Sequence, residues 1–144
     1  GRWSPGFFTF GVMFMTLSKT GETALEIVVV LGASSKPERY SYKAVKLLAE
    51  YGHRVLPVNP YHRDVAGISC VADVAQLKEK VDTVSLYVRP ELLVKDLAQL
   101  VELAPRRVIF NPGTESDEMA EVFSAAGIAT EEACTLVLLR TGQF

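Results

Sequence analysis

The segment Gly-Ala-Ser-Ser-Lys, which follows the first strongly apolar run, carries groups that could bind a phosphate. Gly32 permits a tight backbone bend, and the hydroxyls of Ser34 and Ser35 could donate hydrogen bonds to phosphate oxygens. Lys36 and Arg39 could neutralise the phosphate charge. The spacing matches neither the G-x-G-x-x-G pattern nor a P-loop, and a plain tight turn with solvated charges explains the same residues. Taken alone, this turn does not define a site.

Three more turns with polar residues follow later apolar runs. They contain Asn59 and Pro60, then Tyr87, Val88, Arg89 and Pro90, then Asn111, Pro112 and Gly113. In an open parallel sheet, ligands bind beyond the carboxyl ends of the strands, where helix N-termini present free N–H groups. Four such turns at one edge therefore indicate a crevice more strongly than any single turn does.

The end of the second apolar run, at Asn59 and Pro60, favours a particular kind of nucleotide. Domains that bind NAD usually place Asp or Glu here, to accept hydrogen bonds from the ribose hydroxyls. This chain has no carboxylate at that point and carries Arg63 close behind. The position suits a phosphorylated ribose, or an adenine packed on proline, better than a free diol. An ordinary turn is also consistent with Asn-Pro.

The third turn adds an arginine whose role the sequence leaves open. Tyr87 and Arg89 alternate along an extended run, so they should point to one face while Val88 points away. Arg89 is either a phosphate ligand or an ion-pair partner for a nearby acid such as Glu91.

Residues that could catalyse a reaction are scarce. His62 would need an oriented partner to act as a general base, and none is evident, so a surface or ligand-contact role is favoured. We expect His53 to be exposed. Cys70 and Cys134 show no C-x-x-C or Cys/His spacing and are expected to be small buried residues in a reducing, cytoplasmic compartment. The sequence predicts neither a catalytic residue nor a metal site.

The composition fits one domain with a hydrophobic core, since the chain has 144 residues and a formal net charge of −2. This mild acidity gives no general attraction to nucleic acid or to an anionic membrane. Any anion site must therefore be built locally from hydrogen-bond donors.

We separate an N-terminal segment, residues 1–24, from a domain that we expect to cover residues 25–144. The apolar run 7–17 is too short and too interrupted to span a bilayer. Because the chain opens on Gly1 and carries Met13 and Met15, we interpret the start as expression-derived residues or upstream translation. A poorly ordered tail is favoured over a targeting signal.

Short apolar runs alternate with stretches of helical period from Glu26 onwards. This alternation predicts an α/β fold, a Rossmann-like doubly wound parallel sheet of about five strands in three layers. The expected strands are 26–32, 54–60, 82–88, 106–113 and 134–139, with a short extended piece at 128–130. The expected helices are 41–51, 73–80, 90–103 and 115–126.

The stretch VLGASSKPERYSYKAVKLLAEYGHRVLPVNPYHRDVAGISCVADVAQL resembles the small stand-alone CoA-binding domain family. That family is related to the N-terminal nucleotide-binding domain of the succinyl-CoA synthetase alpha subunit. The resemblance covers about residues 26–144. It rests on the G-A-S turn, the P-x-R-x-S entry to the first helix, the V-N-P after the second strand and the later D-V-A-G.

The resemblance implies a Rossmann-like fold that binds the nucleotide part of coenzyme A. Gly32, Ala33, Ser34 and Ser35 would meet the pyrophosphate, with Lys36, Arg39 and Ser41 beside it. Asn59 and Pro60 would flank the adenosine, Arg63 is a candidate for the ribose phosphate, and Tyr87, Val88, Arg89 and Pro90 would line the next turn.

We therefore expect a protein that binds coenzyme A or an acyl-CoA without catalysis, and that senses it or presents it to a partner protein or a second copy. Two alternatives stay open. One is a protein that binds NAD(P) or another adenine nucleotide, or an enzyme subunit of that kind whose catalytic groups come from a partner. The other is an interaction module whose crevice has lost its ligand.

Overall fold

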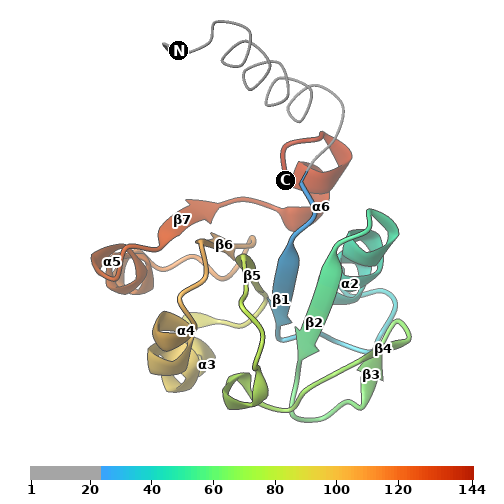
Figure 1. Ribbon diagram of the computed structural model, residues 1–144, viewed down its shortest axis with the longest axis horizontal. Coiled ribbons are helices and arrows are strands. Elements are labelled where there is room, and N and C mark those ends of the chain that lie inside the picture. Colours follow the sequence, from blue (N-terminus) through green and yellow to red (C-terminus); the bar gives the residue numbers. More distant parts are fainter. Residues whose placement is uncertain (1–23) are drawn as a thin grey trace, which may run out of the picture.

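The computed structural model of the protein describes residues 24–144, so the predictions for residues 1–23 lie outside the described residues. One sheet of five parallel strands organises the domain, in the order β2-β1-β5-β6-β7 (Figure 1). The strands are β1 (Ile27–Leu31), β2 (Arg54–Val58), β5 (Thr83–Leu86), β6 (Arg107–Phe110) and β7 (Ala129–Glu132). The predicted doubly wound α/β sheet is confirmed.

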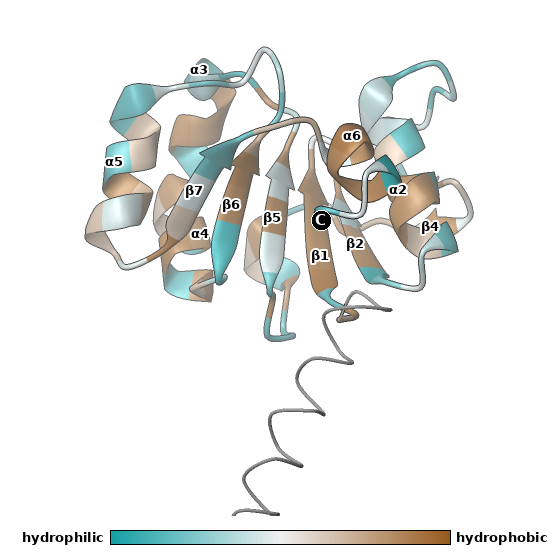
Figure 2. Ribbon diagram, turned by 90° about the horizontal axis from the view of Figure 1, so that it is seen from above, coloured by the Kyte–Doolittle hydropathy of each residue, from teal (hydrophilic) through white to brown (hydrophobic). Residues whose placement is uncertain are grey.

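Helices cover both faces of this sheet and make the three layers visible in Figure 2. One face carries α3 (Pro90–Leu93), α4 (Leu97–Leu103) and α5 (Asp117–Ala125). The other carries α2 (Tyr40–Glu50) and α6 (Thr135–Arg140). Two 3₁₀ turns, Val74–Gln76 and Val94–Asp96, complete the helical elements of the described chain.

Strand β1 shows why the sheet is covered on both sides. Val29 and Leu31 belong to the apolar core beneath α3, α4 and α5, whereas Val28 and Val30 belong to the core beneath α2 and α6. Successive side chains of a strand point to opposite faces, so a strand that is apolar at every position must be buried on both. Burying each such valine contributes about 1.5–3 kcal/mol. The first apolar run therefore fixes the centre of the domain.

The strand order creates a switch point at β1. The chain passes from β1 to its neighbour β2 on one side and later to its neighbour β5 on the other side. The turns that leave β1 and β5 consequently diverge to opposite faces. Open α/β sheets bind ligands in the crevice at this point, outside the carboxyl ends of the strands.

A short hairpin, absent from the expected elements, follows β2. It consists of β3 (Asp64–Val65) and β4 (Ile68–Ser69), and the chain then returns alongside β2. Val71 donates from its N–H to the carbonyl of Pro57 at 3.0 Å and accepts from the N–H of Asn59 at 2.9 Å. The hairpin thus delivers the residues after Val71 to the carboxyl end of β2. Pro57 is tolerated because β2 is an edge strand.

The strand predicted at 134–139 is wrong, because this segment forms helix α6. Leu136 and Leu139 are buried while Val137 between them is exposed, a helical rather than a strand period. The fifth strand is β7, which begins within the short extended piece predicted at 128–130. Its sequence, Ala-Thr-Glu-Glu, lacks an apolar run because β7 lies at the sheet edge, where exposed charges limit pairing with other chains.

Two predicted helices differ from the structure in length and continuity. The segment 73–80 forms only the 3₁₀ turn Val74–Gln76, with Asp73 as its N-cap, as expected. The segment 90–103 begins at Pro90 as expected but is divided into α3, a 3₁₀ turn and α4. Within residues 24–144, no helix has the length and apolar character required to cross a membrane.

Candidate functional site

The turn after β1 packs directly against the turn after β5 through Gly32. The φ angle of Gly32 is +87°, and a Cβ at this position would lie 2.7 Å from Cγ1 of Val88 and 3.0 Å from the carbonyl oxygen of Tyr87. Its N–H donates to the carbonyl of Val58 at 3.0 Å. Only glycine satisfies both the left-handed backbone and this close approach.

Two serines shape the loop between β1 and α2. The N–H of Ser34 donates to Oγ of the buried Ser41 at 3.0 Å, and the N–H of Lys36 donates to Oγ of Ser34 at 3.1 Å. These hydrogen bonds hold the loop against the first turn of α2. Ser35, Lys36 and Arg39 remain exposed on its outer side.

The N-terminus of α2 faces the same edge and is electrostatically open. Its N-cap residue, Arg39, makes no side-chain capping hydrogen bond, and the first turn contains no acidic residue. A helix of eleven residues with free N-terminal N–H groups attracts anions. The predicted phosphate-binding residues therefore lie in the loop that leads into a helix N-terminus suited to an anion.

Asn59 joins the turns after β1 and β2. Its Nδ2 donates to the carbonyl of Ala33 at 2.8 Å, and its Oδ1 accepts from the N–H of Tyr61 at 2.7 Å. Both ends of the side-chain amide are engaged within the protein. Asn59 therefore positions the crevice walls, while the adjacent ring of Pro60 is exposed toward the crevice.

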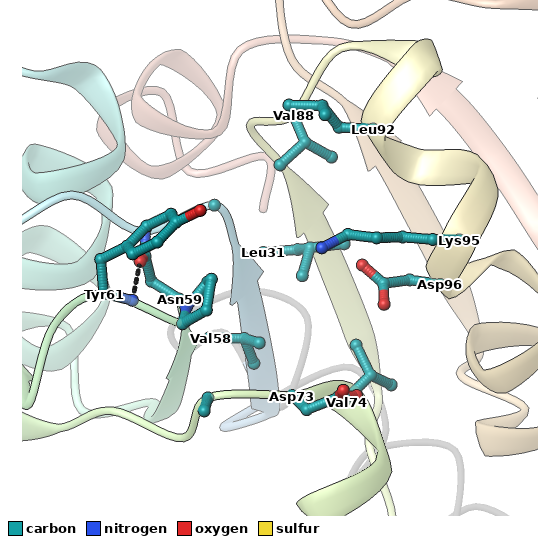
Figure 3. A pocket seen from close by; sticks show the side chains of 13 residues that line it. Leu31, Val58, Asn59, Tyr61, Asp73, Val74, Val88, Leu92, Lys95 and Asp96 are labelled. Carbon is teal, nitrogen blue, oxygen red and sulfur yellow. Dashed lines mark hydrogen bonds between the residues drawn. The ribbon is translucent and has the colours of Figure 1, made fainter.

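A cavity of about 190 Å³ lies at the switch point between the carboxyl ends of β1, β2 and β5 (Figure 3). Four residues of the predicted site line it: Gly32, Asn59, Pro60 and Val88. The remaining lining residues are Leu31, Val58, Tyr61, Ala72, Asp73, Val74, Leu92, Lys95 and Asp96. The predicted cations Lys36, Arg39, Arg63 and Arg89 do not line this cavity; all four are exposed.

The sequence pattern did not predict the charged residues of the cavity, which are Asp73, Lys95 and Asp96. Asp73 arrives through the hairpin, which returns the chain to β2, and Lys95 and Asp96 come from the 3₁₀ turn after α3 (Figure 3). No carboxylate directly follows β2 in the sequence, as expected, but two carboxylates from other segments line the cavity. The four-residue spacing from Leu92 to Asp96 places both side chains on one helix face. This spacing is typical of any helix, so it does not by itself predict a site.

The turn after β6 is largely occupied by internal contacts. The buried Asn111 donates through Nδ2 to Oγ of Ser85 at 2.8 Å and to the carbonyl of Leu86 at 2.9 Å, and its Oδ1 accepts from the N–H of Thr135 at 2.8 Å. Asn111 therefore fixes the start of α6. Pro112 and Gly113 beside it are exposed.

Tyr87 and Val88 lie on opposite faces, as predicted. Val88 packs with the core beneath α3, and Tyr87 packs with the core beneath α2 and α6. Within the described chain the buried hydroxyl of Tyr87 has no hydrogen-bond partner. Burial raises the pKa of Tyr87 to about 12, a rise that the nearby hydroxyls of Thr135 and Ser85 only partly offset. Tyr87 is therefore a neutral phenol at physiological pH.

Arg89 precedes α3 as its exposed N-cap residue, followed by Pro90 at the first helical position. The ion pairs of the described chain include none between Arg89 and Glu91. The phosphate-ligand interpretation of Arg89 therefore stays a prediction.

His53 is buried, with 6% of its surface exposed, so its predicted exposure is wrong. Its Nδ1 accepts from the N–H of Glu26 at 3.0 Å, and its ring lies 5.1 Å from that of Phe144. Burial lowers the pKa of His53, and Arg107 adds to this while Glu26 opposes it. Phe144, which lies far away in the sequence, packs against His53. The burial of His53 therefore could not be predicted from the local sequence pattern.

The other candidate nucleophiles and bases show no catalytic arrangement among the described residues. Burial raises the pKa of the Cys70 thiol, which keeps it protonated. Cys134 is half-buried at the N-cap of α6 and not in a strand, and His62 is half-buried in the loop before β3. Residues 24–144 contain no group of three or more His, Cys, Asp or Glu side chains that could hold a metal ion.

The cavity combines apolar side chains with two carboxylates and one ammonium group, and the Gly32 turn bounds it. Such a site can hold a ring system with a polar edge beside an anionic group.

The CoA binding domain family matches residues 26–140. The chain therefore belongs to this family. A crystal structure of an uncharacterized protein shares the fold, with a TM-score of 0.81 and 38% sequence identity, over 85% of this chain and 100% of that one.

Two curated relatives match parts of the chain. The uncharacterized protein YneT of Bacillus subtilis is 29% identical over 66 residues, which cover 46% of this chain and 49% of YneT. The alpha subunit of acetate–CoA ligase (ADP-forming) II of Pyrococcus furiosus is 29% identical over 83 residues, 57% of this chain and 18% of that subunit. The chain thus matches about half of one relative and a smaller part of the other. The family and the ligase both name CoA, and neither supports the NAD(P) alternative.

Proposed function

We propose that this chain binds coenzyme A through its nucleotide part in the crevice between β1, β2 and β5. The observation that carries the proposal is the cavity at the switch point, bounded by the Gly32 turn, in a chain of the CoA binding domain family. Switch-point crevices are the usual nucleotide sites of such sheets.

The pyrophosphate lies, in this proposal, on the loop from Gly32 to Ser35 at the N-terminus of α2. The N–H groups of residues 32–34 donate within the protein, so the free N–H groups at the start of α2 and the helix dipole supply the attraction there. Lys36 and Arg39 add positive charge from the exposed side of the loop, and Ser41 supports it through its bond to Ser34.

The adenosine occupies the cavity itself. Pro60 and the 86%-exposed Tyr61 form one wall, and Val88 and Leu92 form the opposite apolar wall. Asn59 acts by holding the wall in place rather than by contacting the base. Arg63 and Arg89 lie outside the cavity and are proposed to meet phosphate at its rim.

The rest of the ligand extends toward the turns after β5 and β6. Ala33, Tyr87, Pro90, Asn111, Pro112 and Gly113 belong to this part of the proposal. Among them, Asn111 contributes by fixing the start of α6, since its amide is fully engaged.

We further propose that the chain does not itself catalyse a reaction, and that it senses CoA or presents it to a partner protein or a second copy. The basis is the absence of an arranged nucleophile or base among residues 24–144. A cytoplasmic location, consistent with two free cysteines, is part of the same proposal.

A second candidate function is that of an enzyme subunit whose partner supplies the reactive groups. One relative is the alpha subunit of an ADP-forming acetate–CoA ligase, and this favours it. The two candidates differ in one result: only the second predicts turnover of acyl-CoA, with ADP and phosphate, once a partner subunit is added.

Thermal unfolding with CoA, acetyl-CoA, NAD, NADP and ADP tests the proposal. A ligand at one hundred times its dissociation constant adds about 2.7 kcal/mol to the free energy of unfolding. We expect this effect for CoA and acetyl-CoA and a smaller one for ADP. A response to NAD without a response to CoA would overturn the proposal, and no response to any ligand would favour an interaction module.

A further inference from the structure

Two aspartates line the cavity but differ in what their carboxylates already bind. Asp73 caps the turn Val74–Gln76, and its Oδ1 accepts from the N–H of Ala75 at 2.9 Å. Asp96 lies where the 3₁₀ turn Val94–Asp96 passes into α4, with a helical backbone conformation, and its side chain makes no capping hydrogen bond. Within the described chain it forms neither a hydrogen bond nor an ion pair. Its carboxylate instead points into the cavity (Figure 3).

This carboxylate is partly desolvated by the cavity. Burial raises the pKa of Asp96, Lys95 opposes this effect, and Asp73 adds to it. A hydrogen-bond donor in the cavity would therefore stabilise the charged form of Asp96.

The other amide and charged groups that line the cavity are less available as acceptors than Asp96. Both ends of the Asn59 amide are engaged, and Lys95 can only donate. One oxygen of Asp73 is engaged in capping. Asp96 is therefore the cavity acceptor with both oxygens available, and it stands across the cavity from Asn59 (Figure 3).

We propose that Asp96 accepts a hydrogen bond from the nucleoside part of the bound nucleotide, and so determines which nucleoside the cavity holds. The donor is an N–H or O–H group, either the exocyclic amine of adenine or the ribose 2′-hydroxyl, since the 3′ oxygen of CoA carries a phosphate. Apolar walls leave few other interactions that could orient the nucleoside. This inference rests on the proposed function and adds a specificity-determining residue to it.

The test measures dissociation constants of CoA, ADP, inosine diphosphate and 2′-deoxy-ADP for the wild type and Asp96→Asn. Inosine diphosphate replaces the amine by an oxo group, which a carboxylate repels. If the amine is the donor, the wild type prefers ADP over inosine diphosphate by about tenfold or more, as expected for a hydrogen bond to a charged group. If the 2′-hydroxyl is the donor, 2′-deoxy-ADP shows that loss instead.

In either case the Asp96→Asn variant loses most of the preference, while Asp117→Asn on the exposed start of α5 keeps it. Equal discrimination in the wild type and Asp96→Asn, with CoA still bound by both, would overturn the inference and leave the proposed function standing. Failure of the wild type to bind CoA and ADP would overturn both. Melting temperatures of the two variants establish that each is folded.

Discussion

The two ends of the parallel strands, which we call the amino edge and the carboxyl edge of the sheet, both carry charged residues but differ in the contacts that these residues make. At the amino edge, the buried Glu26 accepts from Oγ1 of Thr83 at 2.6 Å and from the guanidiniums of Arg106 at 2.9 Å and Arg107 at 3.4 Å. Phe144 covers this network, with Arg107 4.4 Å from its ring centroid. At the carboxyl edge, Asp96 faces a cavity without such partners.

The contrast separates groups that stabilise the fold from groups that are available to a ligand. A buried charge whose hydrogen bonds are all made within the protein contributes to one folded arrangement. A charge without such bonds, in the wall of a cavity, lowers its free energy by accepting a hydrogen bond from a ligand. Removing residues from the amino edge should therefore cost stability, and removing them from the carboxyl edge should cost affinity.

The largest expected effect is on stability, from Glu26→Ala. It removes the carboxylate that accepts from Thr83 and Arg106 and from Arg107, whose side chain is only 13% exposed. Breaking a buried ion pair in this way lowers the free energy of unfolding by about 3 kcal/mol or more. Chemical denaturation measures the loss, and CoA affinity of the folded variant should be unchanged.

Glu79→Ala provides the matched control, because Glu79 pairs with Arg54 on the surface. Its loss of stability should be much smaller, since solvent screens exposed pairs. Equal losses in the two variants would contradict the assignment of the Glu26 network to stability.

An intermediate effect is expected from Gly32→Ala, which should lower both the stability of the fold and the affinity for CoA. The new Cβ requires a left-handed backbone and displaces Val88 and Tyr87, so the free energy of unfolding should fall by about 2–3 kcal/mol. CoA affinity should fall as well, because the turn no longer approaches the turn after β5.

Gly127→Ala separates the effect of the backbone conformation from the effect of the close packing. Gly127 also has a positive φ, +82°, but nothing lies within 4 Å of an added Cβ. It lies just before β7, at the opposite end of the strands from the proposed site. Denaturation should show a loss of only about 1 kcal/mol, with no change in CoA affinity. If Gly32→Ala behaved like Gly127→Ala in both measurements, the close packing of the two turns would have no functional consequence.

The smallest expected effect is on affinity alone, from Lys36→Ala with Arg39→Ala. Both residues are exposed, so stability should hardly change, while CoA should bind about tenfold more weakly and with less salt dependence. The pair Lys78→Ala with Lys80→Ala, exposed before β5, removes the same charge from the opposite edge. Titration calorimetry compares them, and equal affinities would remove the phosphate role of the Gly32 loop.

The sequence predicted those features that depend on local pattern. The continuous Ile-Val run required a central strand, Gly32 required a turn, and Pro90 required a helix start. The fold class and the position of the crevice follow from these, because parallel strands bring their carboxyl ends to one edge.

Features that depend on distant contacts were missed. The run at 134–139 could have formed a strand or a helix, and the bond from Thr135 to the buried Asn111 belongs to tertiary structure. His53 is buried by Phe144, and Asp73 reaches the cavity only because the hairpin folds back along β2. The acidic side of the cavity therefore could not be predicted from the residues that directly follow each strand.

Titration calorimetry of the wild type with CoA, alone and in the presence of saturating ADP, tests the central claim most directly. We predict that one CoA binds per chain and that ADP reduces its apparent affinity, because both nucleotides occupy the crevice between β1, β2 and β5. No binding of CoA, or CoA binding that saturating ADP leaves unchanged, would contradict the account.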